Sequence, residues 1–190
     1  KSSKYLSDYA EENGFRVTLG VADIPTAFVA EYGSGKPIIG ILGEFDANPG
    51  ISQKKQATKE PLVKGAAGHG CGHNLFGTAS LGAAIAIKEM IESGEISGTV
   101  RFYGTPAEET IFAKVWMVRA GLFDDLDVCM DWHPGDEIEA STQSSKALVD
   151  FRLKFYGDAA HASGDPWNGN SAVDAMELYT TGLNYYREHV

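Results

Sequence analysis

The stretch "LFGTASLGAAIAIKEMIESGEISGTVRFYGTP", residues 75–106, decides the fold class of this 190-residue chain. Its first part carries Leu and Ile among small residues at helical spacing and ends at Gly94, which predicts a helix. From residue 98 on, a run of β-branched and aromatic residues predicts a strand. The stretch therefore indicates a helix that leads back into a buried strand.

Strand-like segments also lie upstream of this stretch, at residues 16–21, 26–33 and 36–46. A surface helix is predicted before them, over residues 4–13, because its apolar residues share one face. The turn "YGSGKP", residues 32–37, predicts a hairpin between the second and the third of these strands.

Downstream, residues 108–121 predict a further helix and residues 125–134 a further strand. An alternation of strands and helices is typical of an α/β protein. We therefore expect an α/β fold whose mostly parallel sheet is covered by helices on both faces.

The pattern changes near Ser145. Residues 146–157 alternate apolar and polar side chains, which predicts a strand with one solvated face. A glycine-rich loop and an amphipathic helix over residues 171–190 follow. We expect one domain over residues 1–145 and the beginning of a second, α+β domain over residues 146–190. Because the chain starts at Lys1 and stops without an evident end signal, we expect both ends to be trimmed.

Composition and charge exclude several classes of partner. The net charge is −10, whereas nucleic acids and anionic membranes require clustered Lys and Arg. No apolar run is long enough to cross a bilayer, and no signal-peptide pattern opens the chain. Two cysteines make no disulfide framework, so the cytoplasm is the expected location. Of these two, Cys129 lies in an apolar strand and is predicted to be an ordinary core residue.

Residue types that bind metals follow three successive predicted strands: Asp46, then Glu108 and Glu109, then His133. In open α/β sheets, ligands bind beyond the carboxyl ends of the strands. The loop "AAGHGCGHNLFG", residues 66–77, adds Cys71 and His73 at the start of a helix. Thiolate, imidazole and carboxylate together suit Zn²⁺ or a site that tolerates Mn²⁺.

Simpler interpretations exist for each part of this set. The loop is compatible with a glycine turn that carries incidental polar residues, and the two glutamates with the acidic first turn of a helix. A nucleophile pair of Cys71 and a histidine is the competing catalytic interpretation. It leaves Glu108, Glu109 and His133 without a role, whereas a metal site uses them all. In such a site one glutamate binds metal while its neighbour acts as general base.

Five motifs occur in the order and spacing of M20-type metallopeptidases and amidohydrolases. They are "GILGEFDANPG", "GHGCGHNLFGTASLGAA", "VRFYGTPAEE", "GLFDDLDVCMDWHP" and "FYGDAAHAS". Within this family the chain most resembles the aminobenzoyl-glutamate utilisation protein B subgroup. The resemblance covers nearly the whole chain, and the cysteine-containing loop together with "PAEE" is its most specific part.

The resemblance implies a zinc-peptidase-like catalytic domain over residues 1–145 and the beginning of a lid or dimerisation domain over residues 146–190. It implies a homodimeric hydrolase with two divalent ions, Zn or Mn, that cleaves the amide bond of N-acyl or N-aroyl amino acids. The family's last histidine ligand lies beyond the lid, after the end of this chain. The alternative is a non-catalytic or inactive metal-binding scaffold with the same fold.

Matched motif by motif, the resemblance implies four metal ligands: Cys71, His73, Glu109 and His133. Glu108 matches the general base. His161 matches the lid histidine that stabilises the reacting carbonyl oxygen, often across a dimer interface. Asp46, His69 and Asn74 are expected to lie beside the ligands and support them. Many relatives carry Asp at the position of Asn74, which removes one carboxylate from the surroundings of the site.

Overall fold

The computed structural model describes residues 1–140, 142, 144 and 146–189. The chain divides into two compact units, Lys1–Ile138 and Glu139–Val190. Ser145, at the boundary predicted from the sequence, lies outside the described residues. The assignment of the two parts to a catalytic and a lid domain stays a prediction.

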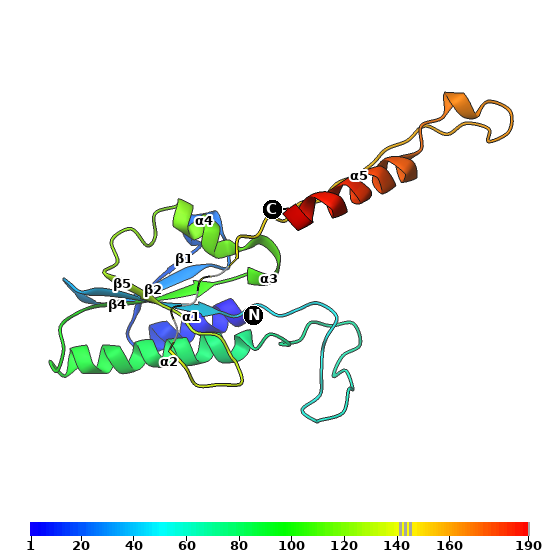
Figure 1. Ribbon diagram of the computed structural model, residues 1–190. Coiled ribbons are helices and arrows are strands. Elements are labelled where there is room, and N and C mark those ends of the chain that lie inside the picture. The colour runs from blue at the N-terminus through cyan, green and yellow to red at the C-terminus, as the bar shows by residue number, and fades with distance from the viewer. Residues whose placement is uncertain (141, 143, 145, 190) are drawn as a thin grey trace. The chain divides into compact units, whose positions relative to one another are not determined.

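The first unit is built on a five-stranded sheet in the order β1-β2-β4-β3-β5 (Figure 1). The strands are β1 (Arg16–Leu19), β2 (Phe28–Ser34), β3 (Ile38–Glu44), β4 (Gly98–Thr105) and β5 (Val128–Met130). Strands β4 and β5 both pair with β3 in parallel, whereas β2 runs antiparallel to β1 and to β4. The α/β class is confirmed, with a mixed sheet in place of the mostly parallel one expected.

The predicted hairpin between β2 and β3 is wrong, because β4 lies between these two strands. Seven of the eight residues of β4 are buried, so this strand occupies the centre of the sheet. It pairs with β2 along one edge and with β3 along the other. The turn at residues 32–37 therefore reverses the chain but leaves room for a third strand.

Strand β5 is at the edge of the sheet, since it pairs only with β3 among the described residues. All three of its residues are exposed. Cys129 is therefore not the core residue that the sequence predicted, because an apolar strand buries its side chains only where other elements cover it.

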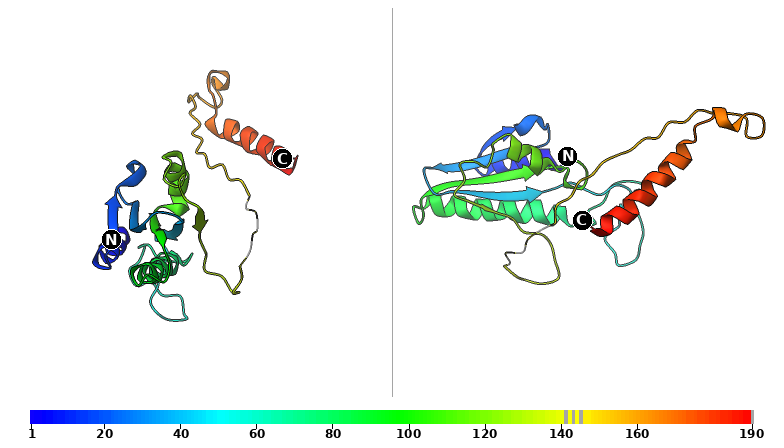
Figure 2. Two further views of the ribbon diagram at one scale, coloured as in Figure 1. Left: turned by 90° about the vertical axis from the view of Figure 1, so that its left-hand side faces the viewer. Right: turned by 45° about the horizontal axis from the view of Figure 1, so that its top comes forward.

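Helices cover both faces of the sheet, as predicted (Figures 1 and 2). Helices α1 (Ser2–Glu12) and α2 (His73–Glu92) lie on one face, and α4 (Ala113–Arg119) lies on the other. The helix predicted over residues 108–121 is divided into α3 (Glu108–Ile111) and α4. Phe112 divides it, because its φ of 53° is left-handed and cannot continue a right-handed helix.

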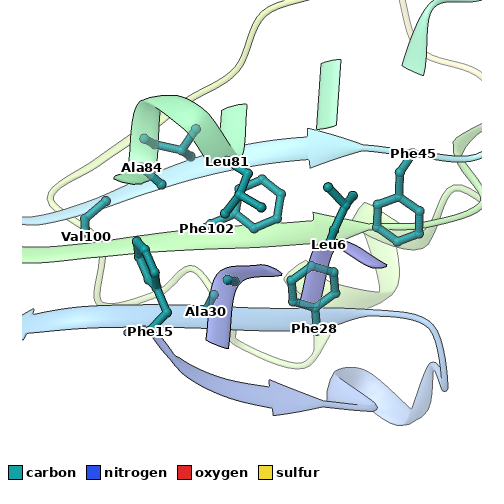
Figure 3. Packing of buried hydrophobic residues seen from close by; sticks show 11 residues of the cluster. Leu6, Phe15, Phe28, Ala30, Phe45, Leu81, Ala84, Val100 and Phe102 are labelled. Carbon is teal, nitrogen blue, oxygen red and sulfur yellow. The ribbon is translucent and has the colours of Figure 1, made fainter. Parts of the chain in front are cut away.

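The main core fills the space between the sheet and the helices α1 and α2 (Figure 3). Phe28 and Phe102 form its centre, with ring centroids 5.6 Å apart, and Leu81 of α2 packs onto it. A smaller cluster around Tyr103 and Met117 lies on the opposite face, under α4. Among the described helices, none combines the length and the hydropathy that crossing a bilayer requires.

The second unit contains a short helical turn at Pro166–Asn168, helix α5 (Ala172–Tyr186) and a final turn at Arg187–His189. No strand is assigned in residues 146–157, where one was predicted. A strand requires a partner for its backbone, and within the described part of this unit the only β-pairing is an isolated bridge between Asp158 and Asn170.

Helix α2 touches β3 most closely at Gly77, where an added Cβ would lie 2.5 Å from the carbonyl oxygen of Glu44. We predict that Gly77→Ala lowers the free energy of unfolding by about 1–3 kcal/mol, because the helix would have to move away from the sheet. Gly82 is the matched control in the same helix, since nothing lies within 4 Å of a Cβ there. Gly82→Ala should raise stability by about 0.5–1 kcal/mol through helix propensity. Urea unfolding of both variants tests this, and equal shifts would contradict it.

Candidate metal centre

His73 is the first residue of α2 and its side chain is only 1% exposed. The chain enters this helix through Gly72, whose φ of 80° is left-handed and whose missing side chain leaves room for Pro134. Nδ1 of His73 lies 2.9 Å from Oδ1 of Asp46. Because an ionised carboxylate only accepts hydrogen bonds, Nδ1 carries the proton and Nε2 presents a lone pair.

Asp46 connects three elements that are distant in sequence. One oxygen accepts from His73, and the other accepts from the backbone N–H of Glu109 at 3.0 Å. The end of β3, the start of α2 and the start of α3 therefore meet at one carboxylate. A carboxylate behind a ligating imidazole fixes the orientation of the ring and raises the basicity of its free nitrogen.

The free nitrogen of His73 faces a second carboxylate. Its Nε2 lies 2.9 Å from Oε2 of Glu44, but the pair is not aligned as a hydrogen bond. Both atoms are buried and have no hydrogen-bond partner among the described residues. Two buried lone-pair atoms at this distance repel each other unless a cation or an additional proton lies between them. Glu44 and His73, joined by Glu108, bring their ligand atoms within 4.8 Å of one another.

Glu44 is the site residue that the sequence reasoning missed. It is 5% exposed at the end of β3, and its other oxygen, Oε1, forms an ion pair with Lys114 of α4. A signal was available, because side chains alternate along a strand and a carboxylate at the end of an apolar strand points into the protein at every second position. Asp46, two residues later, shares that side of the strand and was the carboxylate predicted from the sequence.

A second group of ligand atoms comes from Cys71, His73 and His133, again within 4.8 Å of one another. Sγ of Cys71 lies 3.3 Å from Nε2 of His133. Nδ1 of His133 lies 3.0 Å from the carbonyl oxygen of Pro134. Because a carbonyl only accepts, Nδ1 donates and Nε2 is again the lone-pair atom, the form in which imidazole binds metal.

The position of His133 depends on its neighbour Trp132. The indole N–H of Trp132 donates to Oγ of Ser80 in α2 at 3.1 Å. The ring of Phe76, also in α2, meets both Trp132 and His133 edge-on, with centroids 5.7 and 6.1 Å away. The segment after β5 is thereby attached to the helix that begins with His73.

The two glutamates after β4 differ in environment. Left-handed Ala107 turns the chain so that Glu108 and Glu109 begin α3. Burial is the main cause that raises the pKa of Glu108, followed by the negative charge of Glu44. Burial likewise raises the pKa of the Cys71 thiol, followed by its hydrogen bond with Glu109. In the absence of a cation the thiol is therefore held in its protonated form.

The remaining predicted site residues lie elsewhere. His69 and Asn74 are exposed and line a pocket of about 650 Å³ beside α1 and the start of α2. The residues that line this pocket are Lys1, Ser2, Lys4, Tyr5, Leu6, Asp8, Phe45, His69, Asn74 and Thr78. None of them provides an atom to either ligand group. His161 belongs to the second unit.

The residues present fit a divalent cation. The unpartnered Nε2 of His73 and Oε2 of Glu44 are buried acceptor atoms that face each other. Around them the chain gathers soft and hard ligands of the types that Zn²⁺ and Mn²⁺ accept.

Residues 40–182 match the family model described as peptidase family M20/M25/M40. Over its whole length the chain is 46% identical to one of the polypeptides of the p-aminobenzoyl-glutamate hydrolase from Escherichia coli (strain K12), and it spans 40% of that relative. It resembles the solved YXEP protein of Bacillus subtilis, a dinuclear metal binding peptidase from the M20 family, with a TM-score of 0.55 and 26% identity. That match covers 67% of this chain and 34% of the YXEP chain.

The same fold occurs in a putative aminohydrolase from methicillin-resistant Staphylococcus aureus, with a TM-score of 0.64 and 23% identity. That match covers 98% of this chain and 50% of the other.

The raised pKa of Glu108 has a consequence for metal-free protein. A carboxyl group with a higher pKa in the folded state binds its proton more tightly there, so stability falls as pH rises from the ordinary range of glutamate through the raised value. We predict that Glu108→Gln makes metal-free protein more stable than the parent above this range and equally stable below it. Urea unfolding at several pH values, with chelator present, measures the difference. Exposed Glu137 provides the control, since Glu137→Gln should show no such trend. A pH-independent effect of Glu108→Gln would contradict the prediction.

Proposed function

Because the chain belongs to peptidase family M20/M25/M40, we propose that it contributes the metal centre of a hydrolase that cleaves the amide bond of N-acyl or N-aroyl amino acids. The observation that carries the proposal is the buried, unpartnered pair formed by Nε2 of His73 and Oε2 of Glu44. The name of the 46%-identical relative points to p-aminobenzoyl-glutamate as the first substrate to test.

We propose that Cys71, His73, Glu109 and His133 hold two divalent ions, Zn or Mn, and that Glu44 assists them. The similarity to a dinuclear metal binding peptidase supports the number of ions. When bound, such ions lower the pKa of water and polarise the amide carbonyl. Asp46, behind His73, keeps the imidazole in the form that presents Nε2.

Glu108 is proposed to move the proton in this reaction. Its carboxylate lies with the ligand atoms of Glu44 and His73, where it can accept a proton from the attacking water. Its raised pKa favours holding that proton until the leaving amine takes it up. His161 is proposed to donate a hydrogen bond to the carbonyl oxygen as negative charge develops there.

Assembly and location belong to the same proposal. A homodimer through the second unit is the arrangement that we favour. The 46%-identical relative is named as a subunit of its hydrolase, which supports assembly with another chain. We propose a cytoplasmic location and small-molecule substrates.

Metal binding tests the centre directly. We predict that the purified protein retains or takes up Zn²⁺ or Mn²⁺ in stoichiometric amounts, measured by elemental analysis and calorimetric titration. Glu44→Gln keeps the shape of the side chain but removes its charge, and should weaken binding by about 10- to 100-fold. Lys114→Met is the matched control, because it removes the cation paired with Glu44 and should leave affinity unchanged or higher. Absence of stoichiometric metal together with absence of uptake would refute the centre.

Turnover distinguishes the two adjacent glutamates. We predict that Glu108→Gln keeps its metal but hydrolyses p-aminobenzoyl-glutamate about 10²–10⁴-fold more slowly, as expected for a lost general base. Glu109→Gln should instead weaken metal binding first. Kinetics and metal content measured on the same samples separate these effects. Near-parental turnover in Glu108→Gln would show that the roles are assigned wrongly. A parent that binds metal but hydrolyses no N-acyl amino acid would favour the scaffold alternative.

A further inference from the structure

We propose that the loop of residues 158–170 fixes His161 as the tautomer that carries its proton on Nε2, with Asp165 as the positioning residue. The loop would thereby present a hydrogen-bond donor to an oxygen atom of the substrate. The inference rests on the proposed function, because it concerns the histidine that is expected to stabilise the reacting carbonyl oxygen.

The loop is closed at its base. Asp158 and Asn170 exchange two backbone hydrogen bonds, of 2.9 and 3.0 Å. The side-chain amide of Asn170 adds a third bond to Oδ2 of Asp158, at 3.2 Å. At Gly157 an added Cβ would lie 2.3 Å from the carbonyl oxygen of Asn170, so the two ends of the loop approach as closely as backbone allows. His161 is therefore held by a closed loop although it is exposed to solvent.

Asp165 holds the backbone of His161 on both sides. Its Oδ1 accepts from the N–H of His161 at 2.9 Å, and its own N–H donates to the carbonyl oxygen of His161 at 3.1 Å. Asp165 is in turn attached to Asn168, whose N–H donates to its carbonyl oxygen at 3.0 Å. The direction in which the imidazole leaves the backbone is thereby fixed.

Two backbone groups determine the tautomer of the imidazole. The N–H of Gly164 donates to Nδ1 of His161 at 2.9 Å, and the N–H of Ser163 donates to the same atom at 3.2 Å. A ring nitrogen that accepts carries no proton, so the proton of the neutral imidazole is on Nε2. An added Cβ at Gly164 would lie 3.3 Å from Nδ1, which explains why a residue without a side chain suits this position.

This arrangement is the reverse of that found in the other two histidines. In His73 and His133, Nδ1 faces an acceptor and Nε2 presents a lone pair. In His161, Nδ1 faces donors, and Nε2 makes no hydrogen bond to any residue that the structure describes. A lone pair binds a metal ion, whereas an N–H binds an oxygen. The geometry therefore fits His161 for donation to a carbonyl oxygen and not for metal ligation through Nε2.

The test combines a spectroscopic and a kinetic readout. In protein labelled with ¹⁵N-histidine, NMR correlations at a pH where His161 is neutral should place its proton on Nε2, with the His161→Ala variant identifying the signals. We expect Asp165→Ala to show a mixture of tautomers and a kcat about 10-fold lower, less than the 10²–10³-fold typical of losing such a donor. KM and metal content should not change.

Two variants provide the controls. Asp165→Asn should restore the parental tautomer and rate, because the amide oxygen can still accept from the N–H of His161. Ser163→Ala keeps the backbone N–H and should behave as the parent. If Asp165→Ala does not fold, Gly164→Ala replaces it, since its Cβ would crowd the ring and should also disturb the tautomer.

Two results would overturn the inference: a proton on Nδ1 of His161 in the parent, or parental kcat in a folded Asp165→Ala or Gly164→Ala variant. Failure of the proposed function is recognised separately. A parent without any amide hydrolysis would refute that function, whereas the NMR measurement needs no substrate and decides the state of His161 by itself.

Discussion

The close contact between α2 and the end of β3 is the constraint on which the candidate metal centre depends. At Gly77 the helix approaches the carbonyl oxygen of Glu44 at a distance that no side chain would allow. His73 lies one helical turn earlier, so the same contact places its imidazole between Glu44 and Asp46. If the helix were held further from the sheet, these carboxylates would belong to a strand end with nothing to meet.

The electrostatic consequence is a local excess of negative charge. Glu44, Asp46 and Glu108 converge on one imidazole, and Lys114 is paired with only one of these carboxylates. Carboxylates gathered without matching cations destabilise a folded chain, and the raised pKa of Glu108 is one expression of this. A divalent cation would relieve the repulsion, so metal binding and the stability of this part of the fold are expected to be linked.

The sequence predicted the parts of this arrangement that depend on local pattern. The α/β class follows from periodicity, and the clustering of Cys71, His73 and His133 follows from strand ends and a helix start. The insertion of β4 between β2 and β3 could not be predicted in this way, because strand order is decided by which edges remain free after all strands are buried. The break at Phe112 was missed because a left-handed aromatic residue has no local signal. Glu44 was missed because its importance comes from its position opposite His73, which the chain reaches only after a long loop.

The fit of Gly72 against Pro134 bears on how such centres can be lost in evolution. An added Cβ at residue 72 would lie 2.9 Å from the proline ring, between the loop that carries Cys71 and the segment that carries His133. A descendant of this protein could therefore keep every ligand and still lose the centre, through one substitution at a residue that binds nothing. An inventory of ligands alone overestimates how many such descendants retain the chemistry, and the small residues that bring the ligand-bearing segments together belong in the same comparison.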